Sequence, residues 1–284
     1  MNVTSVGRSA RRRVVVLGAV AGAAALSVAG VAAASAGTAA AHHVPERHKP
    51  TVVLVHGAFA DSSSWNGVVE RLEHDGYQVV APANPLRGLA GDAAYLHSYL
   101  KSVKGPIVLA GHSYGGAVMS QAAVGVPNVK ALVYIAAFIP EAGESALELS
   151  NKFPGSTLGE TLNPVPFPLP GGKTGSDLYI RADKFHGQFA ADVPETTARL
   201  MAATQRPVAA SALEEKATDA AWKTIPSWDL VTTQDKNIPP AAQRFMAKRA
   251  HAHTVETKAS HAVTVSRPGT VTRLIEQAAH ATTR

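Results

Sequence analysis

The segment IVLAGHSYGG, residues 107–116, is the part of the sequence that indicates the fold most directly. Its first four residues are an apolar run typical of a buried strand, and residues with helical periodicity begin at Gly115. Between them lies a G-x-S-x-G pattern centred on Ser113. A strand that turns into a helix with almost no loop forces its central residue into strained geometry, and Gly111 and Gly115 give the neighbouring segments room. We therefore expect Ser113 Oγ to project at the C-terminal edge of a sheet, where α/β sheets bind ligands.

On both sides of this segment, short apolar runs alternate with helical periodicity. The run TVVLV at residues 51–55 is typical of a strand buried on both faces. Further strands are predicted at 77–81, 107–110 and 129–135, and helices at about 62–76, 92–103 and 115–124. This βαβαβαβ order indicates the α/β class with a largely parallel sheet.

The alternation stops near Pro140. Five prolines between residues 154 and 170 exclude a central strand or a long helix there. The pattern then predicts helical structure around 192–221, strands at 228–232 and 254–256, and helices at 240–250 and 268–280. We therefore expect one domain, residues 50–284, with an insertion at about 140–224.

The N-terminal 41 residues have the pattern of an export signal. Four arginines precede an apolar stretch at residues 14–34, and small-residue sites suitable for cleavage follow at Ala36 and Ala41. The run SARRRVV at residues 9–15 resembles a twin-arginine signal. We expect an exported, secreted protein, with residues 42–49 as a linker and no stable membrane association after cleavage. An uncleaved anchor is the alternative, because about 20 apolar residues can span a bilayer.

The charge distribution supports this interpretation. The chain of 284 residues carries a formal charge of +6, but residues 1–41 contain four arginines and no acidic residue, which leaves +2 for the remainder. The densest basic group of that remainder is Arg244, Lys248 and Arg249 on one predicted helix, so no nucleic-acid partner is expected. The chain has no Cys, which excludes disulfides, a thiolate nucleophile and cysteine-ligated metals.

A serine hydroxyl needs a base, and the base needs an orienting acid. His261 is our candidate base, because it follows the last predicted strand and precedes the last helix; His186, His251 and His253 are weaker candidates. Asp235, in the loop after the strand at 228–232, is our candidate acid. The alternative acid, Asp229, begins that strand, away from the expected catalytic edge.

Acyl transfer also requires N–H donors for the developing oxyanion. These would be Tyr114, directly after the serine, and Ala58, in the loop His56-Gly57-Ala58 after the first strand.

Several segments together resemble the α/β-hydrolase superfamily, and within it small bacterial esterases akin to plant methylesterases and hydroxynitrile lyases. They are TVVLVHGAFADSSSW (51–65), GHSYGG (111–116), ALVYIAAFIPEAGES (131–145), TTQDKNIP (232–239) and ASH (259–261). The resemblance implies a mostly parallel eight-stranded sheet with helices on both faces and a small cap insertion. It also implies that Ser113, Asp235 and His261 form a catalytic triad with Ala58 and Tyr114 as oxyanion donors.

Two departures narrow the expected chemistry. Hydroxynitrile lyases of this group have Lys directly after the catalytic His, where this chain has Ala262. Haloalkane dehalogenases and epoxide hydrolases have Asp in the place of Ser113. The sequence therefore predicts a carboxylesterase-type serine hydrolase that needs no metal and no organic cofactor. A lactonase, thioesterase or amidase with the same triad, and a non-hydrolytic receptor-like member, remain alternatives.

The insertion offers hints about the substrate. A compact cap favours small or medium acyl or aryl esters, and Phe59 and His186 are candidate substrate contacts. Seven further apolar side chains are candidates for lining a pocket. They are Phe153, Phe167, Leu169, Phe185, Phe189, Leu200 and Met201.

Overall fold

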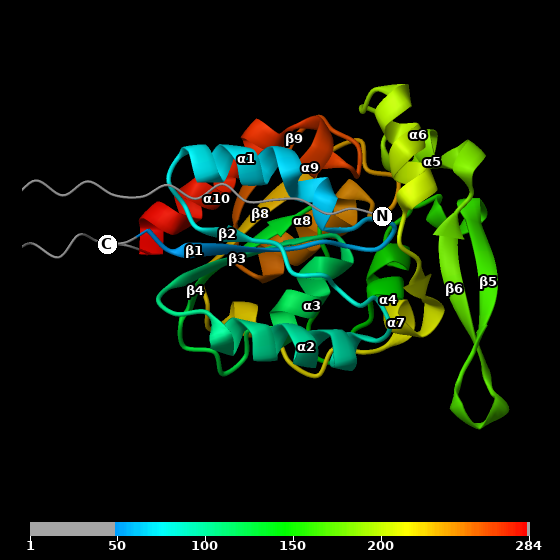
Figure 1. Cartoon of the computed structure of the whole chain (residues 1–284), viewed down its shortest axis with the longest axis horizontal. Helices are drawn as coiled ribbons and strands as arrows, with labels where there is room; N and C mark the ends of the chain where they lie inside the picture. Colours follow the sequence, from blue (N-terminus) through cyan, green and yellow to red (C-terminus); the bar gives the residue numbers. More distant parts are fainter. Residues whose placement is uncertain (1–48, 283–284) are drawn as a thin grey trace, which may run out of the picture. The chain divides into compact units, whose positions relative to one another are not determined.

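The computed structural model describes residues 49–282, which are arranged around a central parallel sheet (Figure 1). The strand order is β2-β1-β3-β4-β8-β9, and every neighbouring pair is parallel. The strands are β1 (Thr51–Val55), β2 (Val79–Val80), β3 (Ile107–His112), β4 (Val129–Ile135), β8 (Ser227–Thr232) and β9 (His253–Thr257). The described part of the sheet thus has six strands where the resemblance implies eight.

Helices cover both faces of this sheet, because its central strands are apolar on both sides. In β3, Ile107 and Leu109 belong to one buried cluster, whereas Val108 and Ala110 belong to the other. The first cluster is covered by α2 (Leu89–Ser102), α3 (Tyr114–Ala122) and α8 (Pro240–Arg249). The second is covered by α1 (Asn66–His74), α9 (Val263–Ser266) and α10 (Pro268–Thr282). Full burial of such side chains stabilises the fold by about 1.5–3 kcal/mol each.

The start of α1 illustrates how local sequence sets an element. A 3₁₀ turn, η1 (Ser62–Trp65), leads into α1, and the Asp61 carboxylate accepts the Ser63 N–H at 2.8 Å. This satisfies an amide that has no partner within the helical turn. Val68 and Leu72, four residues apart, are fully buried against the sheet.

The expected insertion forms a cap at one end of the main sheet (Figure 1). Its elements are α4 (Ala146–Asn151), η2 (Leu158–Thr161), β5 (Leu162–Pro168), η3 (Pro170–Gly172), β6 (Thr174–Ile180), α5 (Ala182–Phe189), α6 (Glu195–Thr204), β7 (Val208–Ala209), α7 (Ala210–Glu214) and η4 (Ala221–Lys223). The strands form a separate antiparallel sheet in the order β5-β6-β7. Every second residue of edge strand β5 from 164 to 168 is proline, which an edge tolerates because alternate N–H groups point away from the partner.

Two predicted elements are shorter than the sequence suggested. The helical structure expected over 192–221 is interrupted, because β7 and irregular segments separate α6, α7 and η4. The strand expected at 77–81 pairs only at Val79 and Val80, where the sheet ends at its edge.

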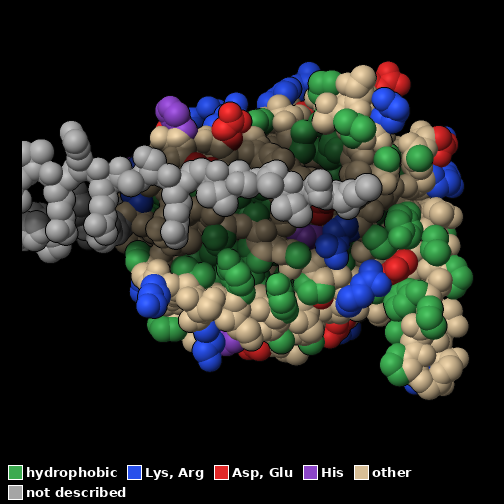
Figure 2. Space-filling model, viewed as in Figure 1, with side chains coloured by type: hydrophobic (Ala, Val, Ile, Leu, Met, Phe, Trp, Pro, Cys, Tyr) green, Lys and Arg blue, Asp and Glu red, His purple; other side chains and the backbone are tan. Residues whose placement is uncertain are grey.

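The predicted export signal and residues 42–48 of the predicted linker lie outside the described residues. Among residues 49–282, no helix combines the length and apolar character that crossing a membrane requires. On the face shown in Figure 2, Lys and Arg side chains are scattered and interspersed with Asp and Glu.

Candidate active site

Ser113 occupies a sharp turn between β3, which ends at His112, and α3, which begins at Tyr114. Its backbone has φ 54° and ψ −125°, a conformation that residues other than Gly rarely adopt. The turn is held from both sides, since the Ser113 carbonyl accepts the N–H groups of Gly116 at 3.0 Å and Phe138 at 3.2 Å. The strain expected from the G-x-S-x-G pattern is therefore present.

The glycines of the turn are needed for close packing. A Cβ placed on Gly115 would lie 2.5 Å from the carbonyl oxygen of Val55, and one placed on Gly111 would lie 2.7 Å from the carbonyl oxygen of Gly115. Neither space accommodates a methyl group without a shift of backbone.

The structure brings Ser113, His261 and Asp235 together. His261 Nε2 accepts a hydrogen bond from Ser113 Oγ at 2.9 Å, and its Nδ1 donates to Asp235 Oδ2 at 2.7 Å. The three residues come from the loops that follow β3, β8 and β9, whose carboxyl ends meet at one edge of the parallel sheet. All three are buried, with His261 only 1% exposed.

The Asp235 carboxylate accepts four hydrogen bonds besides the one from His261. Its Oδ1 accepts the backbone N–H groups of Asn237 at 2.8 Å and Ile238 at 3.0 Å. Its Oδ2 accepts hydrogen bonds from Thr232 Oγ1 and Gln243 Nε2, both at 3.0 Å. These donors fix the carboxylate so that it faces His261.

Asp229, the alternative acid, lies elsewhere. It is in the interior of β8, 1% exposed, and burial raises its pKa well above the ordinary value. Its Oδ2 has no hydrogen-bond partner among residues 49–282. His261 is thus oriented by Asp235, and Asp229 is a buried carboxyl outside the hydrogen-bonded group.

His112 and His56, which adjoin the site in sequence, support its backbone. His112 Nε2 donates to the His261 carbonyl at 2.9 Å, and burial lowers the pKa of His112 to about 3, so the ring is neutral. His56 Nε2 accepts the N–H of Asn84 at 2.9 Å, and burial also lowers the pKa of His56.

The two expected oxyanion donors border the space in front of Ser113. Tyr114 is the first residue of α3, so its N–H belongs to the amides without an intrahelical acceptor. Its side chain points away and donates from the hydroxyl to Asp92 at 2.9 Å. Ala58 lies in the loop after β1, and the next residue, Phe59, has a φ of 60° and donates its N–H to the Arg206 carbonyl of the cap at 3.0 Å.

A pocket opens directly onto Ser113. It encloses about 420 Å³ of space, part of it open to solvent, and we call it the inner pocket. Its lining is mostly apolar and contains no Lys, Arg, Asp, Glu or His. The lining residues are Ala58, Phe59, Ser113, Tyr114, Phe138, Ala146, Leu147, Ser150, Leu158, Leu213, Asn237 and Ile238.

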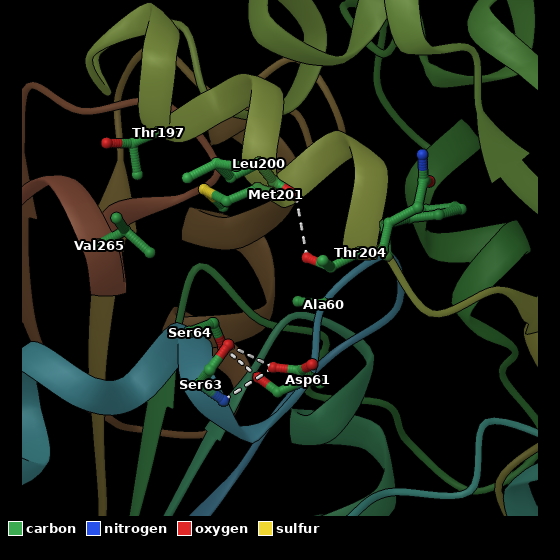
Figure 3. Close-up of a pocket in the computed structure, with 11 residues that line it drawn as sticks. Ala60, Asp61, Ser63, Ser64, Thr197, Leu200, Met201, Thr204 and Val265 are labelled. Carbon is green, nitrogen blue, oxygen red and sulfur yellow. Dashed lines mark hydrogen bonds between the residues drawn. The ribbon is translucent and has the colours of Figure 1, made fainter.

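A second pocket shares Phe59 with the inner pocket, and we call it the outer pocket. Figure 3 shows it between Leu200 and Met201 of α6 and the turn at Asp61, with about 610 Å³ of space. Of the seven apolar cap residues predicted to line a pocket, only these two line either of the pockets beside Phe59; Phe185 and Phe189 are instead fully buried.

The two candidate substrate contacts have different positions. Phe59 lines both pockets. His186 lines neither, because it lies on α5 and its Nε2 donates to the Val193 carbonyl at 2.9 Å.

The end of helix α5 contributes contacts that the sequence did not reveal. The Phe189 ring packs against the His261 ring, with ring centres 5.0 Å apart. The Phe189 backbone carbonyl accepts a hydrogen bond from the Ala262 N–H at 2.9 Å. Gln188 Nε2 donates to Lys236 and Asn237, next to Asp235. The cap therefore contacts both loops, the one with Asp235 and the one with His261. No sequence motif marks either residue.

With this geometry established, comparison with known proteins gives the family. Residues 52–274 match the model of the alpha/beta hydrolase family, which is most of the chain. The chain belongs to that family. The alpha/beta hydrolase described here is 27% identical over 257 residues to "Alpha/beta hydrolase nvfD" of Aspergillus novofumigatus, covering 81% of this chain and 97% of that protein. It is 33% identical over 113 residues to "Carbendazim hydrolyzing esterase" of Nocardioides sp., covering 35% of this chain and about half, 47%, of that protein.

Among solved structures, polyneuridine aldehyde esterase superposes on this alpha/beta hydrolase with a TM-score of 0.71 at 18% identity. The superposition covers 81% of this chain and 99% of the esterase. At that identity the likeness establishes the shared fold. No group of three or more His, Cys, Asp or Glu side chains within residues 49–282 is arranged to hold a metal ion.

Proposed function

We propose that this alpha/beta hydrolase cleaves carboxylic esters through Ser113, His261 and Asp235. The observation that carries the proposal is the continuous pair of hydrogen bonds through His261, 2.9 Å to Ser113 Oγ and 2.7 Å to Asp235 Oδ2. The relatives named as an esterase and a hydrolase support ester cleavage in general.

In the proposed mechanism, Ser113 Oγ attacks the ester carbonyl while His261 Nε2 takes its proton. The N–H groups of Ala58 and Tyr114 stabilise the negative oxygen of the tetrahedral intermediate. His261 then gives the proton to the leaving alcohol, which forms the acyl-enzyme. Water deprotonated by His261 releases the acid and restores Ser113. Asp235 keeps the imidazole in the tautomer that accepts at Nε2.

We propose small to medium acyl or aryl esters as substrates. The inner pocket, which has Ser113 in its lining, supports a short or medium group beside the nucleophile, and the larger outer pocket, which shares Phe59 with it, supports a larger group. The test is a hydrolysis screen of the chain from His42 onward across acyl length and alcohol type. Ser113→Ala is expected to abolish hydrolysis, whereas Ser102→Ala, at an exposed helix end, retains it. Equal hydrolysis by the Ser113 variant would refute the proposal.

We also propose that residues 1–41 direct export and that the protein is secreted. Support comes from the arginine run, the apolar stretch and the small-residue sites in that order. N-terminal sequencing of protein from the culture medium is expected to start at Gly37 or His42. Protein retained in membranes with its first residues intact would support an uncleaved anchor instead.

A further inference from the structure

The inner pocket contains a buried polar side chain whose donor group has no partner among residues 49–282. Asn237 is 3% exposed and lines this pocket, yet its Nδ2 has no hydrogen-bond partner among residues 49–282. A buried donor without an acceptor is rare, because the group loses its bonds to water and gains none in return. Such a group calls for an explanation, and the ligand is one candidate partner.

The orientation of this amide follows from its neighbours. Gln188 Nε2 donates to the Lys236 carbonyl at 2.9 Å, while Gln188 Oε1 accepts Thr157 Oγ1 at 2.8 Å. These two bonds settle which end of Gln188 is the nitrogen. That nitrogen also contacts Asn237 at 2.8 Å, so the Asn237 atom facing it must be the oxygen. The Nδ2 group is therefore turned away from Gln188.

The backbone around Asn237 is equally fixed. Its N–H donates to Asp235 Oδ1 at 2.8 Å, and its carbonyl accepts Ser150 Oγ at 3.1 Å and Ser156 Oγ at 3.0 Å. Only Nδ2 remains for another partner. The residue lies two positions after Asp235, in the same pocket lining as Ser113.

We propose that Asn237 Nδ2 donates a hydrogen bond to an uncharged oxygen acceptor in the substrate, such as an ether or ketone oxygen separate from the scissile ester. This inference rests on the proposed ester hydrolysis and adds a substrate class to it. An uncharged acceptor is favoured because the inner pocket has no Lys, Arg or His to neutralise a carboxylate. The buried Asp235 carboxylate nearby would also repel an anion.

The test compares esters that differ in one atom. On the acyl side, p-nitrophenyl hexanoate is compared with three analogues in which an ether oxygen replaces C3, C4 or C5. On the alcohol side, pentyl acetate is compared with 2-ethoxyethyl acetate. Each kcat/KM is divided by the rate constant for hydroxide-catalysed hydrolysis of the same ester, which removes differences in intrinsic reactivity between the esters. We expect at least one ether ester to exceed its methylene counterpart by about tenfold, the order of magnitude of one net hydrogen bond.

Asn237→Leu keeps the side-chain size and removes the amide, so it is expected to reduce that preference to about one while both esters are still cleaved. Asn84→Leu is the matched control, because Asn84 is equally buried but lines neither pocket. It is expected to leave the preference unchanged even if both rates fall. A wild-type ratio near one for every pair would overturn the Asn237 proposal without touching ester hydrolysis, and would point to a buried water as the partner. Absence of hydrolysis for all esters would overturn both proposals.

Discussion

Gly57→Ala tests whether the loop after β1 and the Ser113 turn are packed as tightly as the mechanism needs. A Cβ on Gly57 would lie 2.6 Å from Ser113 Cβ and 2.8 Å from the His112 carbonyl oxygen. Carbon atoms normally approach to about 3.5–4.0 Å, so the loop and the turn must separate by about 1 Å. Both contacts join the loop after β1 to the Ser113 turn, the two segments that carry the proposed oxyanion donors and the proposed nucleophile. A displacement of about 1 Å in such a site costs on the order of 10²-fold in rate.

The assay is kcat and KM on p-nitrophenyl acetate, with thermal unfolding to confirm that the variant is folded. We expect kcat to fall on the order of 10²-fold for Gly57→Ala. Gly91→Ala is the control, since a Cβ there meets no atom within 4 Å and the residue lies inside α2. The control is expected to keep full activity and to gain about 0.5–1 kcal/mol of stability. A folded Gly57→Ala protein with more than half of the wild-type kcat would refute the packing argument.

Three further substitutions separate the roles assigned above. Asp235→Asn is expected to lower kcat on the order of 10⁴-fold. Asp229→Asn is expected to leave kcat within about twofold, because Asp229 lies outside the hydrogen-bonded group of Ser113, His261 and Asp235. The reverse result would make Asp229 the acid. Asp229→Asn is also expected to stabilise the fold in a pH-dependent way. Burial raises the pKa of Asp229 above 3.8, so the folded state keeps a proton that the unfolded chain releases, and wild-type stability falls as pH rises through that window. The extra unfolding free energy of Asp229→Asn over the wild type, measured by urea unfolding, is therefore absent at pH values below 3.8 and grows above that pH. A stabilisation that does not depend on pH would contradict the raised pKa of Asp229. Phe189→Ala should cost about 3–5 kcal/mol of stability and lower kcat more than it changes KM, because the ring packs against His261; an unchanged kcat would show that the ring does not position the base.

The sequence was sufficient for the parts of the site that depend on local geometry. The G-x-S-x-G pattern predicted the strained Ser113, because a direct strand-to-helix turn at this position requires a backbone conformation of this kind. The order of strands predicted that the loops holding Asp235 and His261 would reach the same edge, because the carboxyl ends of parallel strands meet there.

The remaining contacts depend on tertiary packing that has no sequence period. The cap was predicted as an insertion, but its antiparallel sheet and the contacts of Gln188 and Phe189 were not. These side chains act through partners 48 to 72 residues away, and nothing in the local pattern of α5 identifies them. His186, on the same helix, is a candidate base and substrate contact by sequence, but its Nε2 donates to the Val193 carbonyl within the cap.

The proposed mechanism depends above all on Ser113 as the nucleophile and on its activation by His261. The most direct measurement is intact-protein and peptide mass spectrometry after reaction with diisopropyl fluorophosphate. We expect a single adduct on the peptide containing Ser113, formed at a rate that falls sharply in His261→Ala and in parallel with the loss of esterase activity. An active protein that forms no adduct, or forms it on another residue, would refute the role of Ser113 as the nucleophile.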